Sequence, residues 1–114
     1  FSTAVSIPSG MSRTIVSNIV VQNCTTGIDV ASSSTTQATI TQNFLTTCVT
    51  GISVASSGCI VSANNITGDS STTAIGLNIL GNANVITSNY VTGHTNTDIN
   101  VTGNQNVVMA NVTL

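Results

Sequence analysis

Short apolar-polar-apolar triplets recur along the chain at a nearly constant interval. The first apolar residues of successive triplets are 23, 24, 25 and 22 residues apart. A period of two places both apolar side chains of a triplet on one face of a strand and the polar one on the other. The pattern therefore predicts short strands that each have one buried face and one solvent-exposed face. The apolar pairs are Val5/Ile7, Ile28/Val30, Ile52/Val54, Leu77/Ile79 and Ile99/Val101.

A second block, of the form apolar-x-x-Asn-x-apolar, follows each of the triplets. The blocks are Ile15/Asn18/Val20, Ile40/Asn43/Leu45, Val61/Asn64/Ile66, Ile86/Asn89/Val91 and a partial Val108/Asn111. Self-similarity at this interval is typical of solenoids, in which each repeat buries its apolar face against the next. Helical spacing of apolar residues is absent, and Asn and Gly clusters mark the corners between strands.

A repeat of 22–25 residues fits a three-sheet parallel coil better than the shorter repeat of a left-handed hexapeptide coil. The chain resembles the right-handed parallel β-helix group, which includes pectate-lyase-like proteins and viral tailspikes. We therefore predict an all-β fold, a right-handed parallel β-helix (β-solenoid) of about 4.5 coils, with strands about 4.8 Å apart. It forms a single domain over residues 1–114. We expect a fragment of a larger protein, because the chain opens at Phe1 and stops partway through a repeat.

The recurring asparagines predict a structural ladder. Each follows an apolar residue by three positions, which places it at one repeated bend, where Asn tolerates left-handed backbone geometry. Stacked amides there would satisfy backbone groups of neighbouring coils. The predicted members are Asn18, Asn43, Asn64, Asn89 and Asn111. The alternative use of asparagine is glycosylation, since Asn23, Asn65, Asn100 and Asn111 match the acceptor pattern.

Composition removes several classes of function. Only 4% of residues are charged, with one Lys or Arg and a net charge of −2. Nucleic acid and acidic lipid are therefore poor partners, and no apolar run is long enough to span a membrane. The three cysteines lack metal-ligand spacing. Cys24 and Cys48 lie one repeat apart and predict a stacked buried pair; the alternative is a disulfide, which would need local distortion.

The sequence offers little for catalysis. Its acidic residues are Asp29, Asp69 and Asp98. Asp29 and Asp98 lie three coils apart in the predicted solenoid, which is too far for a catalytic pair. His94 lies in a corner segment and is interpreted as a solvated turn residue, and the chain contains no Glu or Lys that could partner His94 or Tyr90. We predict no enzyme activity, no catalytic residues, no cofactor and no metal. Longer connections at 32–37 and 68–73 predict insertions, either tolerated bulges or binding loops.

The outer surface suggests a partner. The residues just before the second strand of each coil read Thr14, Thr39, Ile60, Val85 and Val107. Stacked Ile60, Val85 and Val107 would form an exposed apolar stripe, which on other proteins usually marks an interface. We therefore expect self-association, as a parallel homotrimer.

The resemblance implies a function as well as a fold. It implies a rigid shaft or attachment module of a virus spike or fibre, on the virion surface or extracellular, with a host-cell-surface glycan as a further partner. A carbohydrate-binding or polysaccharide-degrading β-helix, with its catalytic residues outside this segment, is the alternative. An ice-binding or adhesin solenoid is the third. Against ice binding, the pairs Thr39/Thr41 and Thr95/Thr97 fall at non-equivalent positions.

Overall fold

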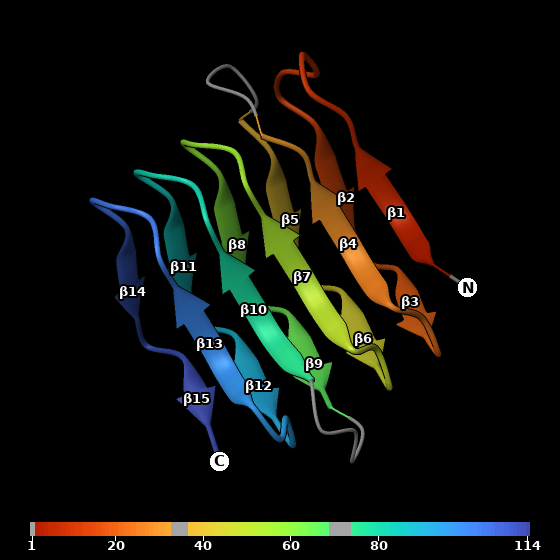
Figure 1. Cartoon of the computed structure of the whole chain (residues 1–114). Helices are drawn as coiled ribbons and strands as arrows, with labels where there is room; N and C mark the ends of the chain where they lie inside the picture. Colours follow the sequence, from red (N-terminus) through yellow and green to blue (C-terminus); the bar gives the residue numbers. More distant parts are fainter. Residues whose placement is uncertain (1, 33–36, 69–73) are drawn as a thin grey trace.

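The computed structural model describes residues 2–32, 37–68 and 74–114. Within this part the chain forms fifteen strands and no helix, arranged as three parallel sheets of five strands each (Figure 1). Sheet A contains β1 (Thr3–Ile7), β4 (Thr26–Val30), β7 (Thr50–Val54), β10 (Ile75–Ile79) and β13 (Thr97–Val101). Sheet B contains β2 (Ile15–Ser17), β5 (Thr39–Thr41), β8 (Ile60–Ser62), β11 (Val85–Thr87) and β14 (Val107–Met109). Sheet C contains β3 (Val20–Gln22), β6 (Phe44–Thr46), β9 (Asn65–Thr67), β12 (Tyr90–Thr92) and β15 (Val112–Thr113).

Each turn of the chain contributes one strand to every sheet, and we call such a turn a rung. Rung 1 is β1 to β3, and rung 5 is β13 to β15. In Figure 1 the chain rises along sheet A in front, returns behind through sheets B and C, and advances from the N-terminus on the right to the C-terminus on the left. This is a right-handed coil, the hand that crossovers between parallel strands almost always take. The predicted right-handed parallel β-solenoid is confirmed.

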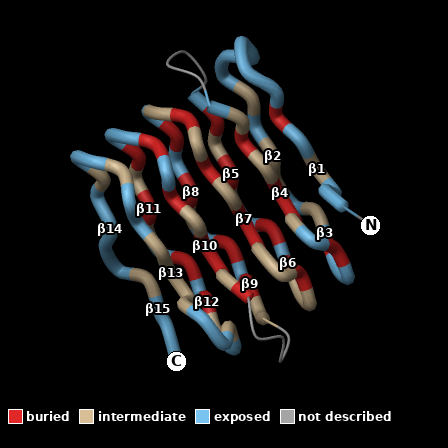
Figure 2. Tube along the Cα trace, viewed as in Figure 1, coloured by how far each residue is buried: buried red, intermediate tan, exposed pale blue. Residues whose placement is uncertain are grey.

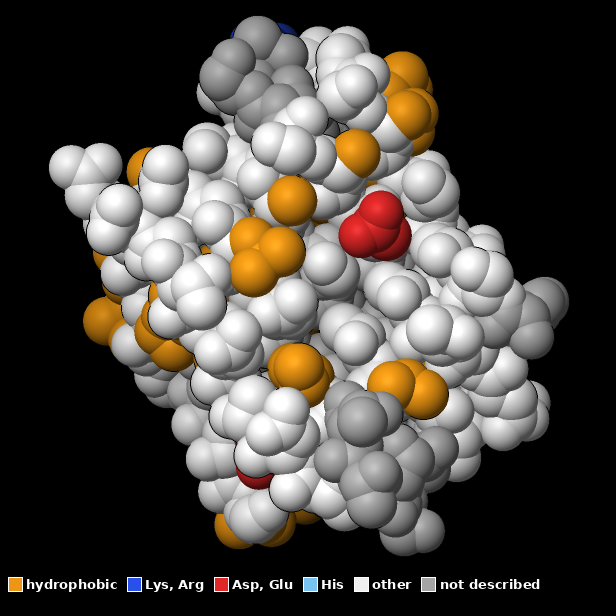
Figure 3. All heavy atoms as spheres, viewed as in Figure 1, with side chains coloured by type: hydrophobic (Ala, Val, Ile, Leu, Met, Phe, Trp, Pro, Cys, Tyr) orange, Lys and Arg blue, Asp and Glu red, His pale blue; other side chains and the backbone are white. Residues whose placement is uncertain are grey.

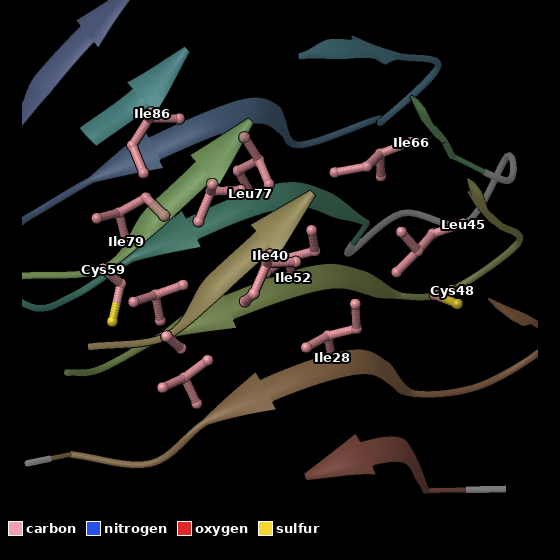
Figure 4. Close-up of a cluster of buried hydrophobic side chains, with 14 of the residues drawn as sticks. Ile28, Ile40, Leu45, Cys48, Ile52, Cys59, Ile66, Leu77, Ile79 and Ile86 are labelled. Carbon is pink, nitrogen blue, oxygen red and sulfur yellow. The ribbon is translucent and has the colours of Figure 1, made fainter. Parts of the chain in front are cut away.

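Register in sheet A follows the triplets found in the sequence. Ile28, Ile52, Leu77 and Ile99 pair in one column, and Val30, Val54, Ile79 and Val101 pair in a second. Side chains of the first column stack inside the coil, as Figure 4 shows for Ile28, Ile52 and Leu77. Because each rung covers the next, the core residues of rungs 2 to 4 are buried, whereas the inner residues of rung 5 at the C-terminal end remain partly open (Figure 2).

The first coil departs from the predicted register by one residue. Val16 pairs with Ile40, and Val21 pairs with Leu45, so Ile15 and Val20 point outward. With a side-chain period of two, a slip of one residue exchanges the inner and outer faces. The consecutive apolar residues around Ile15 and Val20 make both registers compatible with the sequence, and pairing with rung 2 selects the observed one.

The bend between sheets B and C contains one left-handed residue in every rung, but that residue is not the ladder asparagine. Positive φ occurs one position earlier, and the expectation that the stacked asparagines themselves are left-handed was wrong. The left-handed residues of this bend are Asn18 (φ 57°), Gln42 (58°), Ala63 (54°), Ser88 (60°) and Ala110 (56°).

The two predicted insertions fall mainly on residues 33–36 and 69–73, which lie outside the described residues, as does Asp69. A search of the described ranges finds no helix of the length and apolarity needed to cross a membrane.

Candidate functional site

A ladder of buried asparagines runs along the bend between sheets B and C. The Oδ1 atom of Asn64 accepts hydrogen bonds from the backbone N–H and the Nδ2 of Asn43, at 3.1 and 3.0 Å. Asn89 accepts the same pair from Asn64, both at 3.0 Å, and Asn111 accepts it from Asn89, both at 2.9 Å. Each amide thus joins its own rung to the next one.

The second hydrogen of each Nδ2 group goes to a backbone carbonyl of the preceding rung. Asn64 donates to the Ile40 carbonyl and Asn89 to the Val61 carbonyl, both at 2.9 Å. Asn43 and Asn111 donate to Val16 and Ile86 in the same way. Buried amides require such full pairing, because an unpaired polar group in the interior is costly. The ladder is a structural element that fixes the rung register.

Asn18 does not belong to this ladder, and that prediction is corrected. The structure places Ile19 in the ladder position of rung 1, where its backbone N–H donates to Asn43 Oδ1 at 3.2 Å. Asn18 is the exposed left-handed residue before it. The same one-residue shift that moves Ile15 and Val20 to the surface removes Asn18 from the column.

A second, shorter asparagine ladder lies at the corner between sheets A and B. Asn84 Oδ1 accepts from the Cys59 backbone N–H at 2.7 Å, and Asn106 Oδ1 accepts from the Asn84 backbone N–H at 2.8 Å. Asn84 is fully buried. We did not predict this ladder, although Asn84 and Asn106 each lie two residues before the inward Ile86 and Val108, a spacing that could have revealed it.

The predicted outer stripe of Ile60, Val85 and Val107 forms one column of sheet B. Ile60 and Val107 are 43% and 47% exposed, and Val85 is half-buried. Thr14 does not extend this column, contrary to prediction. Ile15 does, because it pairs with Thr39, and it is 69% exposed.

A neighbouring exposed column on sheet C was not predicted from the sequence. It consists of the first residue of each strand: Val20, Phe44, Asn65, Tyr90 and Val112. All five are exposed. The two columns flank the bend that holds the asparagine ladder, and we call this surface the B–C face.

The strands of the B–C face carry no charged residue, and the nearest charge among the described residues is Arg13, which lines a shallow pocket together with Ile15, Thr39 and Ile60. None of the strands of sheets B and C contains Asp, Glu, Lys or Arg. Asp29 and Asp98 both belong to sheet A, whose outer surface is otherwise mainly uncharged and polar with isolated hydrophobic groups (Figure 3). A face with apolar columns on strands that lack charged residues is the part of the described surface best suited to contact another protein.

The side chain of His94 is buried, which corrects its interpretation as a solvated turn residue. Its side chain is 0% exposed, and its Nδ1 lies 3.0 Å from Asp98 Oδ1. Asp98 Oδ1 also accepts from the His94 backbone N–H at 3.3 Å. Gly68 and Gly76 give the ring its space, since a Cβ on either would lie within 3.0 Å of an imidazole carbon.

The position of His94 in its rung explains its burial. His94 follows the left-handed Gly93 at the corner between sheets C and A, as Cys24 follows Asn23 and Cys48 follows Thr47. The three side chains therefore share the inward position of that corner, and their spacing by whole repeats was the signal in the sequence. His94 Nε2 is enclosed and lacks a hydrogen-bond partner within the described structure. Since that atom is enclosed, a substrate could reach it only after the corner opens.

Among the described residues no group of three His, Cys, Asp or Glu side chains is placed to hold a metal ion. Asp29 and Asp98 lie on different rungs of sheet A, β4 and β13, with β7 and β10 between them. The carboxylates are therefore not brought together in the way that glycoside hydrolysis requires.

The cysteines occupy two different corners. Cys24 and Cys48 stack between sheets C and A with their Sγ atoms 2.8 Å apart, both buried. Cys59 lies between sheets A and B, where burial raises the pKa of its thiol.

The architecture defines the class of this chain as a parallel β-solenoid with internal asparagine ladders. None of the protein-family models, curated proteins and solved structures compared with the chain matches it. The resemblance to pectate-lyase-like and tailspike proteins consequently belongs with the proposals that follow.

Proposed function

We propose that this β-solenoid is a non-enzymatic structural and attachment module that associates with copies of itself through the B–C face. The observation that carries this proposal is the pair of outer apolar columns on two sheets without a charged residue. About a quarter of the residues of an ordinary globular protein are charged. A surface that contacts only water would ordinarily carry charged side chains, whereas this face exposes Ile60, Phe44 and Tyr90 on strands without a charged residue.

Three parallel copies packed around a common axis would bring their B–C faces together. In such a threefold arrangement each contact is heterologous, so the sheet B column of one copy faces the sheet C column of the next, and strands without charged residues avoid repulsion between the copies. The asparagine ladders keep the register of each coil, so the assembly would be a stiff shaft. The resemblance to tailspike-type β-helices favours the homotrimer and a place in a virus spike or fibre, on the virion surface or extracellular, where a host-surface glycan could be bound.

Sedimentation velocity over a range of concentrations tests the self-association. We expect the unchanged chain to form trimers, and the double variant Ile60→Asp/Val107→Asp to remain monomeric. Asn78→Asp is the matched control, because it adds a charge on the outer face of sheet A. It also retains an oxygen to accept the 2.8 Å hydrogen bond from Asn100 Nδ2. Circular dichroism confirms that each variant is folded. A wild-type chain that stays monomeric at every concentration would refute the interface.

The polysaccharide alternative is distinguished by incubation with a panel of polysaccharides. New reducing ends or unsaturated products would replace the structural proposal with an enzymatic one. The ice-binding alternative has one new observation in its favour, a column of Thr46, Thr67 and Thr92 on sheet C. The adjacent column contains Phe44 and Tyr90 and is therefore uneven, which disfavours a flat threonine array.

A further inference from the structure

The corner between sheets C and A places two thiols in contact on neighbouring rungs. Cys24 follows β3 in rung 1, and Cys48 follows β6 in rung 2. Their Sγ atoms are 2.8 Å apart, and the Val49 N–H donates to the Cys24 carbonyl at 3.0 Å. From this geometry we propose that Cys24 and Cys48 are a site of disulfide formation that fastens rung 1 to rung 2.

The backbone at the two positions suits such a bond. Each cysteine follows a left-handed residue, Asn23 (φ 58°) or Thr47 (φ 54°), so the two side chains leave the corner in the same direction. Rungs of a parallel sheet are stacked at about 4.8 Å, which lies within the Cα separations of about 4.4–6.8 Å that disulfides span. An S–S bond is about 2.05 Å long, so closing the 2.8 Å contact moves the sulfurs by less than 1 Å. The change in sulfur separation that the bond requires is therefore small.

The reaction requires an oxidant, for which we specify a small-molecule disulfide such as oxidised glutathione. The thiolate of one cysteine attacks a sulfur of the oxidant and forms a mixed disulfide, which releases one small thiolate. The second cysteine thiolate then attacks the protein sulfur of that mixed disulfide, which forms the Cys24–Cys48 bond and releases the second small thiolate. The protein loses two protons and two electrons, and the oxidant is reduced to two thiols.

Burial determines when this exchange can occur. Cys24 and Cys48 are 6% and 2% exposed, so an oxidant reaches them before the corner packs or after rung 1 opens. Rung 1 is the end of the described stack, and its strands pair on one side only: β1 with β4, β2 with β5, and β3 with β6. An end rung opens more readily than an internal one. The bond would therefore fasten one of the two end rungs of the described stack, which pair with a neighbour on one side only.

The pairing should be selective. Cys59 lies at the other corner, between sheets A and B, whereas Cys24 and Cys48 share one column. The two cysteines are 24 residues apart. Closing a loop of that length restricts the unfolded chain and raises stability.

The test begins with the Cys59→Ala variant, which leaves only the two proposed partners. The protein is refolded from urea with oxidised and reduced glutathione, then digested with a protease that cleaves before aspartate. Cleavage before Asp29 and Asp69 separates Cys24, in fragment 1–28, from Cys48, in fragment 29–68. We expect the two fragments to be linked until a reductant is added, with no titratable thiol left in the unfolded variant. Oxidation should raise the Tm by roughly 10 °C.

The controls are Cys24→Ser and Cys48→Ser in the same background, which cannot form the bond and should show no redox-dependent shift in Tm. The wild-type chain with all three cysteines should retain one thiol, on Cys59. Two persistent thiols in the Cys59→Ala variant, glutathione attached to both cysteines, or links only between different chains would each overturn the proposal. A disulfide that uses Cys59 in the wild-type chain would overturn its selectivity.

Discussion

Replacing Asn64 with alanine should destabilise the coil far more than replacing its neighbour Asn65. The Asn64 side chain takes part in four hydrogen bonds, as donor to Ile40 O and Asn89 Oδ1 and as acceptor from the N–H and Nδ2 of Asn43. It is 1% exposed, so water cannot replace the lost partners.

The magnitude follows from the groups that lose their partners. In Asn64→Ala the backbone N–H of Asn43 and one hydrogen of its Nδ2 group no longer have an acceptor. Each unsatisfied buried group costs about 1–3 kcal/mol, which gives a loss of roughly 2–6 kcal/mol before any cavity is counted. The total stability of a domain is about 5–15 kcal/mol. The variant should therefore unfold at a much lower urea concentration.

Urea titration followed by far-ultraviolet circular dichroism measures this loss, because the chain contains no Trp. Asn65→Ala is the matched control: it removes an equal side chain from the next position, and its one hydrogen bond, from Thr67 at 3.4 Å, is exposed. We expect the control to change the free energy of unfolding by less than about 0.5 kcal/mol. Equal, small effects of the two substitutions would refute the claim that the ladder stabilises the coil.

Two further predictions concern the interior of the coil. Gly51→Ala would place a Cβ 2.5 Å from Ile66 Cγ2 and 2.6 Å from the Gly76 carbonyl oxygen, so it should cost about 1–3 kcal/mol in urea unfolding. The double variant Gly51→Ala/Ile66→Ala should lose less free energy of unfolding than the sum of the losses in the two single variants, because removing the Ile66 side chain relieves the clash. Strictly additive losses would contradict the predicted clash. Burial raises the pKa of the Cys59 thiol above its ordinary 9.0, so the unfolded chain loses this proton at lower pH than the folded chain. Its contribution to stability is complete below about pH 9 and falls as the pH rises through the folded pKa. Cys59→Ala should therefore reduce the decline in stability between pH 8 and 10, and an unchanged decline would count against this cause.

The repeat and the inner columns of sheet A in rungs 2 to 4 could be predicted because a polar residue separates the two apolar residues of each triplet. In Ile28-Asp29-Val30 or Thr39-Ile40-Thr41 only one register buries the apolar side chains. Rung 1 lacks that isolation, since Ile15 is followed directly by Val16. In rung 1 the pairing with the strands of rung 2 selects the register, and the sequence of rung 1 alone does not determine it.

At the bends, local backbone preference does not decide which residue is left-handed. Asn is the residue best suited to left-handed geometry after Gly, yet Gln42, Ala63 and Ser88 adopt it here. A left-handed residue without this preference costs roughly 1–2 kcal/mol. In rungs 2 to 4 the next residue offsets that cost, because its buried amide joins two rungs through hydrogen bonds.

His94 was misjudged for a related reason. Its neighbours Gly93 and Thr95 indicate an exposed turn, and only the alignment with Cys24 and Cys48 shows that the position points inward. In a solenoid, the column a residue belongs to decides its environment more than its neighbours in sequence do, because contacts come from the rungs on either side.

The same reasoning applies to the outer surface of the coil. Inner columns must fit the rungs on either side, so Ile, Val, Leu and Asn recur there, whereas outer columns are under no such constraint. Apolar residues nevertheless recur on the outer columns of the B–C face, at Ile15, Ile60 and Val107. This surface is therefore the one that we propose for contact with a second copy of the chain.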